Sequence, residues 1–235
     1  MALVLLHPVG LDRECWQFAD IEDNIALDLP GHGKYDGEIV LPVSLEVIAD
    51  DVCARIPGQF DILGLSMGGM VAMHVALRHP NRVRSMVLAC TSAAPTAAVM
   101  LERARAVEAE GMEAVLAGTL VRWFSSRALA DPNHAGVAYA RSRLLAADSR
   151  AFALCWRAMA VHNVTDRLGN IHIPVTVIAG DADAASPAAS LRAMADGLPL
   201  SRFEIVPGPH MLPLEEPRRF VDAVGRHQRW VAGSA

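Results

Sequence analysis

The feature that most constrains the fold of this chain is an alternation of short apolar runs with longer helical patterns. The runs are almost continuously apolar, which is typical of strands that are buried on both faces. Alternation of this kind predicts an α/β protein with a mainly parallel sheet of about six strands and helices on both faces. The apolar runs cover residues 2–6, 24–27, 60–63, 83–89, 175–179 and 202–206, and the helical patterns cover residues 45–55, 70–78, 188–195 and 217–229.

One interval interrupts the alternation. Residues 93–165 contain no strand pattern, and they indicate several helices, among them 97–110, 112–123 and 150–161. Long insertions between the strands of a sheet commonly serve ligand binding. We therefore expect residues 1–92 and 166–235 to form the core and residues 93–165 to form a helical lid (cap). A purely structural insertion is the alternative.

The composition narrows the class of protein. Of the 235 residues, 52% are hydrophobic and the formal net charge is −5, so no basic face for nucleic acid is expected. No apolar stretch is long enough to span a bilayer, and the apolar start lacks the basic residues of a signal peptide. The 4 cysteines and 9 histidines show neither disulfide-framework nor zinc-ligand spacing. We expect a cytoplasmic protein with no metal ion, no membrane partner and no nucleic-acid partner.

The strongest local signal is a G-x-S-x-G pattern formed by Gly64, Ser66 and Gly68. An apolar run precedes it and a helical pattern follows it, so Ser66 is predicted to lie on a sharp turn between a strand and a helix. Glycines flank such a turn because the strand and the helix pass too close for a β-carbon. The amino end of the helix favours the negative charge that develops during acyl transfer. The pattern therefore predicts that Ser66 is the nucleophile of a serine hydrolase.

A serine nucleophile needs a base, and the base needs a carboxylate that orients it. In proteins with this kind of turn the acid and then the histidine follow the serine along the chain, after later strands. The run 175–179 is followed by Asp181 and Asp183, and the run 202–206 is followed by His210. We predict that His210 is the base, with an exposed loop histidine as the alternative. Either aspartate fits the position of the acid.

A tetrahedral intermediate also needs two hydrogen-bond donors for its oxyanion. One predicted donor is the backbone N–H of Met67, which directly follows the nucleophile, and the other belongs to the loop after the first strand. Pro8 in that loop has no N–H, so Val9 is the candidate, and Gly10 gives the loop the freedom to turn. A simple turn is the alternative for this loop.

Taken in order, these motifs resemble the α/β-hydrolase superfamily over nearly the whole chain. Members of that superfamily carry the acid in a G-x-x-D-x-x-x-P pattern, which runs here from Gly180 to Pro187 and favours Asp183 over Asp181. The resemblance implies an α/β-hydrolase fold, a Ser-His-Asp triad and catalysis without a cofactor. Further matching segments are Asp28-Leu29-Pro30-Gly31-His32-Gly33, Asp166 and Ile173-Pro174.

Within the superfamily the chain is most similar to the 3-oxoadipate enol-lactonase branch. The similarity is carried by the opening segment from His7 to Asp12, by Arg122-Trp123-Phe124, and by the spacing from Met100 to Gly111. It implies hydrolysis of a small ester or lactone, and it further implies that this substrate is acidic. An acidic substrate requires a cation in its pocket, and Trp123 is a candidate for lining that pocket. The arginines available in the insertion are Arg122, Arg127, Arg141, Arg143 and Arg157.

The chain departs from the family pattern in two places. Pro8 stands where glycine is usual after the first histidine, and the first run corresponds to the third strand of the family. Two leading strands are therefore expected to be missing from one edge of the sheet. We expect that edge to be available for pairing with a second subunit in a homo-oligomer.

The same motifs serve several activities, because a fold does not fix a function. The rivals are a generalist carboxylesterase, a cofactor-free perhydrolase, a C–C bond hydrolase and a ligand receptor with slow turnover. The residues that distinguish these activities are expected in the insertion, where the sequence offers no motif.

Overall fold

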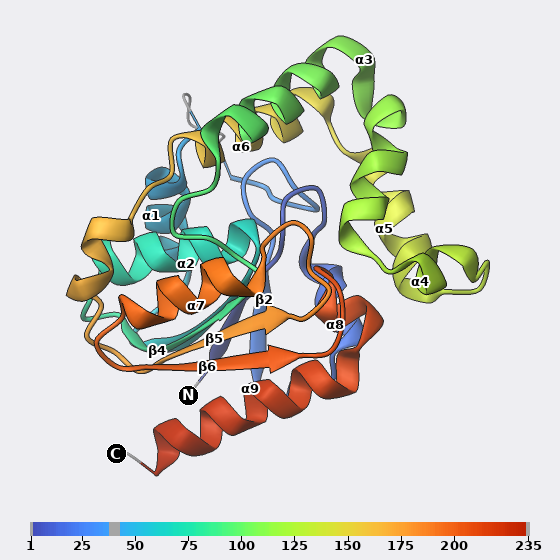
Figure 1. Cartoon of the computed structure of the whole chain (residues 1–235). Coiled ribbons are helices and arrows are strands. Elements are labelled where there is room, and N and C mark those ends of the chain that lie inside the picture. Colours follow the sequence, from blue (N-terminus) through green and yellow to red (C-terminus); the bar gives the residue numbers. More distant parts are fainter. Residues whose placement is uncertain (1, 38–42, 234–235) are drawn as a thin grey trace.

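A six-stranded sheet forms the centre of the protein, as shown by a computed structural model that describes residues 2–37 and 43–233 (Figure 1). Each neighbouring pair of strands is parallel, and the order across the sheet is β2-β1-β3-β4-β5-β6. The predicted α/β class and the six parallel strands are confirmed. The strands are β1 (Leu3–Leu6), β2 (Asn24–Leu27), β3 (Phe60–Leu65), β4 (Val83–Ala89), β5 (Val175–Gly180) and β6 (Ser201–Val206).

The direction of strand addition reverses at β1. From β1 the chain moves outward to β2 on one side and then returns to place β3 on the other side. The loops that leave β1 and β3 therefore diverge and frame a crevice at the carboxyl ends of the strands, where open α/β sheets bind ligands. The loop with Val9 follows β1 and Ser66 follows β3, so the topology brings both to this crevice.

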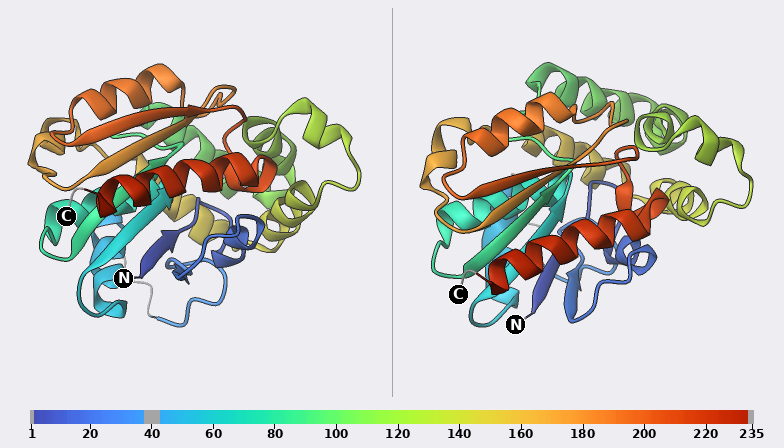
Figure 2. Two further views of the ribbon diagram at one scale, coloured as in Figure 1. Left: turned by 90° about the horizontal axis from the view of Figure 1, so that it is seen from below. Right: turned by 60° about the horizontal axis from the view of Figure 1, so that its bottom comes forward.

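Helices cover both faces of the sheet (Figure 2). Helices α1 (Leu45–Arg55), α2 (Met67–Arg78) and α7 (Ala188–Asp196) lie on one face, and α9 (Pro217–Ala232) lies on the other. The helix α1 begins at Leu45 because the Ser44 hydroxyl accepts a hydrogen bond of 3.2 Å from the N–H of Val47. Three short elements complete the core, namely η1 (Arg13–Phe18), η2 (Thr165–Asn170) and α8 (Leu212–Glu215).

Burial differs between the inner and outer strands. The strands β1, β3 and β5 are buried along their whole length, as parallel strands between two helical layers should be. The expectation of burial on both faces is wrong for β2 and β6, because these strands form the two edges of the sheet and expose Ile25 and Ile205. The edge at β2 is the one that we expect to pair with a second subunit, and this pairing stays a prediction.

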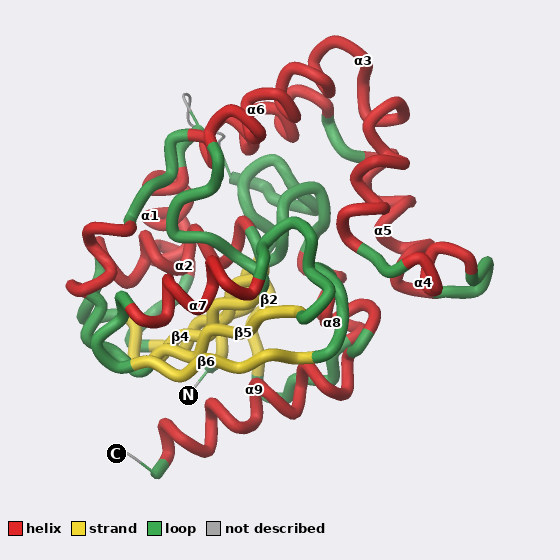
Figure 3. The backbone as a smooth tube through the Cα atoms, in the orientation of Figure 1, coloured by secondary structure: helices red, strands yellow, loops and turns green. Residues whose placement is uncertain are grey.

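A helical insertion separates β4 from β5 and lies over the carboxyl ends of the strands (Figures 1 and 3). The sequence patterns did not indicate α4 and α5, because α4 is short and α5 is weakly amphipathic. Both nevertheless form helices because they consist mainly of good helix formers. In the described parts of the chain, no helix is both long and apolar enough to cross a membrane. The insertion consists of α3 (Ala97–Trp123), α4 (Ser126–Ala130), α5 (Ala135–Ala146) and α6 (Ser149–Ala160).

The long helix α3 is bent at Gly111. The sequence patterns end one helix before this residue and begin another after it, and the backbone there has a φ of 78° and a ψ of 177°. The helix α3 packs mainly against α6. The start of α6 is fixed by a 2.7 Å hydrogen bond from the N–H of Ala151 to the Asp148 carboxylate. The insertion is thus a small helical layer of its own above the sheet.

Candidate active site

Ser66 lies on a sharp turn between β3 and α2. Its backbone has a φ of 54° and a ψ of −117°, which non-glycine residues rarely adopt. A β-carbon at Gly64 would lie 2.2 Å from the carbonyl oxygen of Gly68, and one at Gly68 would lie 2.1 Å from that of Leu6. Both positions therefore require glycine. The Thr91 hydroxyl donates a hydrogen bond of 2.7 Å to the Ser66 carbonyl and helps to hold the turn.

The structure brings His210 and Asp183 to Ser66 from the loops that follow β6 and β5. The Nε2 atom of His210 lies 3.0 Å from Ser66 Oγ, and its Nδ1 atom lies 2.8 Å from Asp183 Oδ2. Asp181, the other candidate acid, is exposed and accepts a hydrogen bond of 2.8 Å from the N–H of Gly208. Of the two aspartates, Asp183 is the one in contact with the histidine.

The surroundings of Asp183 favour its ionised form. Burial alone would raise its pKa, but the charge and hydrogen bond of His210 and the N–H groups of Ser186 and Ala185 hold this pKa below its usual value. The two N–H groups reach Oδ1 at 2.9 and 2.8 Å, which leaves Oδ2 directed at the histidine. An ionised carboxylate accepts the Nδ1–H of an imidazole, so Nε2 is free to accept the proton of Ser66.

A buried thiol also contacts this carboxylate. The donor atoms of Cys90, Asp183 and His210 all lie within 4.8 Å of one another, which raises the question of a metal site. Burial and the charge of Asp183 raise the pKa of the Cys90 thiol well above its usual value, so the thiol stays protonated and can donate to the carboxylate. The thiolate is the form that binds metals, so a protonated Cys90 is suited to hydrogen bonding with Asp183 and not to metal binding.

The two predicted oxyanion donors belong to segments that pack against each other. Met67 is the first residue of α2, so its N–H has no acceptor within the helix. Val9 lies in the loop after β1, is buried, and lines the same chamber as Ser66. The close approach of Gly68 to Leu6 joins the start of α2 to the end of β1. The geometry therefore places both segments beside Ser66.

Two buried histidines join the loop after β1 to the segment after β2. The N–H of Gly10 donates to His32 Nε2 and the N–H of Leu29 donates to His7 Nε2, each at 3.0 Å. A ring nitrogen that accepts from an amide is unprotonated, so each ring carries its proton on Nδ1, which faces the carbonyl of a nearby proline at 3.0 and 2.8 Å. Burial lowers the pKa of His7 to about 4 and that of His32 to about 3, which keeps both rings neutral.

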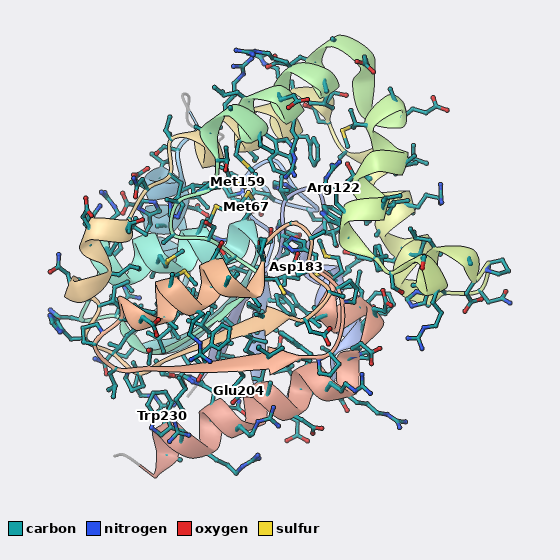
Figure 4. The ribbon with its side chains drawn as sticks, viewed as in Figure 1. Met67, Arg122, Met159, Asp183, Glu204 and Trp230 are labelled. Atoms are coloured by element: carbon teal, nitrogen blue, oxygen red, sulfur yellow. The ribbon has the colours of Figure 1, made fainter. Side chains whose placement is uncertain are left out.

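Ser66 and His210 open into a chamber of about 300 Å³ beneath the insertion. Trp123, which the sequence suggested as a pocket residue, lines this chamber. Arg122, the suggested cation, lines an adjoining chamber instead. Figure 4 shows Asp183 at the carboxyl edge of the sheet and Arg122 above it, toward the insertion.

Arg103 lines both chambers, although it was not among the arginines predicted to supply a cation to the pocket. Its spacing from Met100, three residues earlier on the same helical face, is the signal that could have found it. Three of the other candidate arginines instead form ion pairs with acidic side chains. These pairs are Arg127–Glu216, Arg143–Asp12 and Arg157–Glu108.

Comparison with known proteins agrees with the fold described above. Residues 3–223 match the model of the alpha/beta hydrolase family, so the chain belongs to that family. It is 28% identical to the 3-oxoadipate enol-lactonase 1 of Acinetobacter baylyi over 94% of this chain and 85% of the relative. It is 34% identical to a pimeloyl-[acyl-carrier protein] methyl ester esterase of Neisseria meningitidis, over 78% of this chain and 75% of the relative.

A solved structure extends the similarity to three dimensions. The thermophilic esterase of Thermogutta terrifontis, solved with malate bound, superposes with a TM-score of 0.88 at 28% identity. The match covers 98% of this chain and 90% of the esterase. The superposition therefore spans both the sheet and the helical insertion of this chain.

Proposed function

We propose that this protein is a serine hydrolase that cleaves a carboxylic ester or lactone through an acyl-enzyme. The observation that carries the proposal is the 3.0 Å approach of His210 Nε2 to Ser66 Oγ, with the serine held in a strained turn at the start of α2. A hydroxyl and an imidazole in hydrogen-bond contact form the pair that activates a serine nucleophile. Asp183, which faces the other ring nitrogen, completes the arrangement.

The proposed reaction has two halves. In the first, His210 takes the proton of Ser66 while Oγ attacks the substrate carbonyl, and the same histidine then protonates the leaving oxygen. In the second, His210 takes a proton from water, the resulting hydroxide attacks the acyl-enzyme, and Ser66 recovers its proton as it leaves. The N–H groups of Val9 and Met67 hold the oxyanion in both halves. Asp183 fixes the tautomer of the histidine and balances its transient charge.

The finer proposal is that the substrate is small and resembles that of the 3-oxoadipate enol-lactonase branch. The chamber of about 300 Å³ suits a small molecule. The relatives named above are a lactonase and a methyl ester esterase, and both reactions pass through the same tetrahedral intermediate at a carbonyl carbon. A dicarboxylate, malate, is bound in the solved structure of the related esterase. These similarities support an ester or lactone with an acidic group.

The test combines covalent labelling with turnover. Wild-type protein is treated with a fluorophosphonate and its intact mass is measured, while p-nitrophenyl acetate hydrolysis is followed in parallel. We expect a single adduct, located on Ser66 by peptide mapping, and steady turnover. The variant Ser66→Ala is expected to lose the adduct and about 10⁴-fold or more of kcat while keeping its thermal unfolding midpoint.

A matched control keeps this test specific. Ser142 is exposed on α5, and the variant Ser142→Ala is expected to be labelled and to turn over like the wild type. Turnover that survives in Ser66→Ala would refute the proposal. Labelling without turnover would favour the slow ligand receptor over the enzyme.

A further inference from the structure

A second chamber lies inside the helical insertion, next to the chamber at Ser66. Its volume is about 350 Å³, and it is lined by residues from both halves of α3 and from α6. Val99, Arg103 and Trp156 line both chambers, so the two spaces meet along these side chains. The second chamber is therefore separated from the chamber at Ser66 only by side chains that line both.

Two arginines give this second chamber a positive charge. Arg103 stacks its guanidinium 4.8 Å from the centre of the Trp156 ring, and Arg122 donates a hydrogen bond of 2.9 Å to the Thr119 hydroxyl. In the part of the chain that the structure describes, neither guanidinium forms an ion pair with a carboxylate. Glu102 also lines the chamber, but this residue is exposed.

Both arginines are held in an unfavourable environment for a cation. Burial, and after it the nearby charge of Arg122, lower the pKa of Arg103 to about 10, and the smaller effect of the Glu102 charge acts in the opposite direction. Burial also lowers the pKa of Arg122. Like charges that share a partly buried site without a counter-ion are costly, and an anion placed between them removes the cost.

The remaining arginines of the insertion differ from this pair. Arg157 is bound on the outer surface by Glu108 at 2.6 Å, Arg143 is bound by the Asp12 carboxylate, and Arg127 is bound by Glu216. Arg105, Arg141 and Arg150 are exposed to solvent. The two arginines without acidic partners that are also partly buried are therefore the two that face the second chamber.

We propose that Arg103 and Arg122 bind the free carboxylate of the substrate in this second chamber while the ester or lactone carbonyl lies at Ser66. The inference rests on the proposed hydrolase function and names its substrate class, which is the monoester of a short dicarboxylic acid or a lactone with a carboxylate side chain. A guanidinium matches a carboxylate through two parallel hydrogen bonds, so this pair selects for a flat anion as well as for charge.

The test uses matched substrates that differ in the distal group. The kcat/KM values of monomethyl succinate, monomethyl glutarate and monomethyl adipate are compared with that of methyl hexanoate, by titrating the acid that is released. For the wild type we expect a preference for one of the monoesters over the neutral ester. In Arg103→Gln and in Arg122→Gln we expect this ratio to fall by about 10- to 100-fold, mainly through KM. The control Arg157→Gln, on the outer surface, is expected to keep the wild-type ratio.

A binding measurement makes the inference independent of turnover. Monomethyl glutarate is titrated calorimetrically into Ser66→Ala and into the double variant Ser66→Ala/Arg103→Gln, after thermal unfolding has shown that both are folded. We expect binding to the first and at least a tenfold weaker affinity for the second.

The outcomes separate the two proposals. If the wild type cleaves methyl hexanoate as well as the monoesters, and Arg103→Gln does not alter the ratio, the anion site is refuted and the hydrolase stands. If no ester is cleaved but the monoester binds in an Arg103-dependent manner, the hydrolase is refuted and the anion site stands. Equal binding by the single and double variants refutes the anion site whatever the turnover.

Discussion

Replacing His32 with leucine removes the acceptor that holds the Gly10 N–H beside the proposed oxyanion loop. The lost hydrogen bond is 3.0 Å long and His32 is only 8% exposed, so the amide is left without a partner in a place that water hardly reaches. An unsatisfied buried donor costs about 1–3 kcal/mol. We expect the free energy of unfolding of His32→Leu to fall by this amount.

The same substitution should slow catalysis in the protein that stays folded. Gly10 directly follows Val9, whose N–H is the proposed oxyanion donor, so a shift of Gly10 moves that donor. Complete loss of an oxyanion donor costs about 10²–10³ in kcat, and displacement by about 1 Å can cost about 10². Because His32 holds the neighbouring residue and not the donor itself, we expect kcat to fall by about 10- to 100-fold with little change in KM.

The assay measures kcat per active site, with active sites counted by fluorophosphonate labelling, and measures stability by urea unfolding. The control His32→Gln offers a carboxamide oxygen near the position of Nε2, and it is expected to recover much of the lost rate. Loss of stability in His32→Leu with an unchanged kcat per active site would show that the histidine is structural only. Unchanged stability and rate together would refute the reasoning about the loop.

Two further predictions follow from buried groups and close contacts. Burial lowers the pKa of His7, His162 and His227 to about 4 and that of His32 to about 3, so between about pH 4 and 6.5 the unfolded chain binds more protons than the folded one. The free energy of unfolding should therefore decrease as the pH falls through this window, by about 1.4 kcal/mol per pH unit for each histidine. Urea unfolding at pH 7, 6 and 5 checks this, and coinciding curves would contradict it. Gly68→Ala should prevent the turn at Ser66 from forming, because its β-carbon would lie 2.1 Å from a backbone oxygen, whereas Gly169→Ala meets nothing within 4 Å. Soluble yield and circular dichroism of the two variants check this, and a well-folded, active Gly68→Ala would contradict it.

The strand and helix pattern could be predicted from the sequence because it depends on local rules. The strand β4 and the helix α1 have the predicted bounds. The start of α1 is marked by Ser44, and β4 is mainly apolar. The exposure of β2 and β6 could not be predicted in the same way. Whether a strand is an edge depends on the order of strands across the sheet, which an apolar run does not contain.

Some residues of the candidate site could also be predicted from the sequence, and others could not. Ser66, Asp183 and His210 follow strands whose carboxyl ends meet at one edge. Their order along the chain was enough to place Ser66 and His210 together with one of two aspartates, and the resemblance to the family then favoured Asp183 over Asp181. The position of Arg103 in the chamber was not predicted, because it depends on the contact between Arg103 and Trp156, which lies on another helix. The side chains that face one another across two helices are decided by packing, which a single amphipathic pattern does not specify.

The bend at Gly111 has a consequence for the spacing of the two chamber arginines. Arg103 lies before the bend and Arg122 after it, so the angle at one backbone position sets the distance between two charges that this residue does not touch. A β-carbon at position 111 would meet nothing within 4 Å, so the only barrier to substitution is the φ of 78°, which side-chain-bearing residues rarely adopt. In the proposed anion site, a different backbone angle at residue 111 would therefore change the length of monoester that fits, without any change in the residues that bind it.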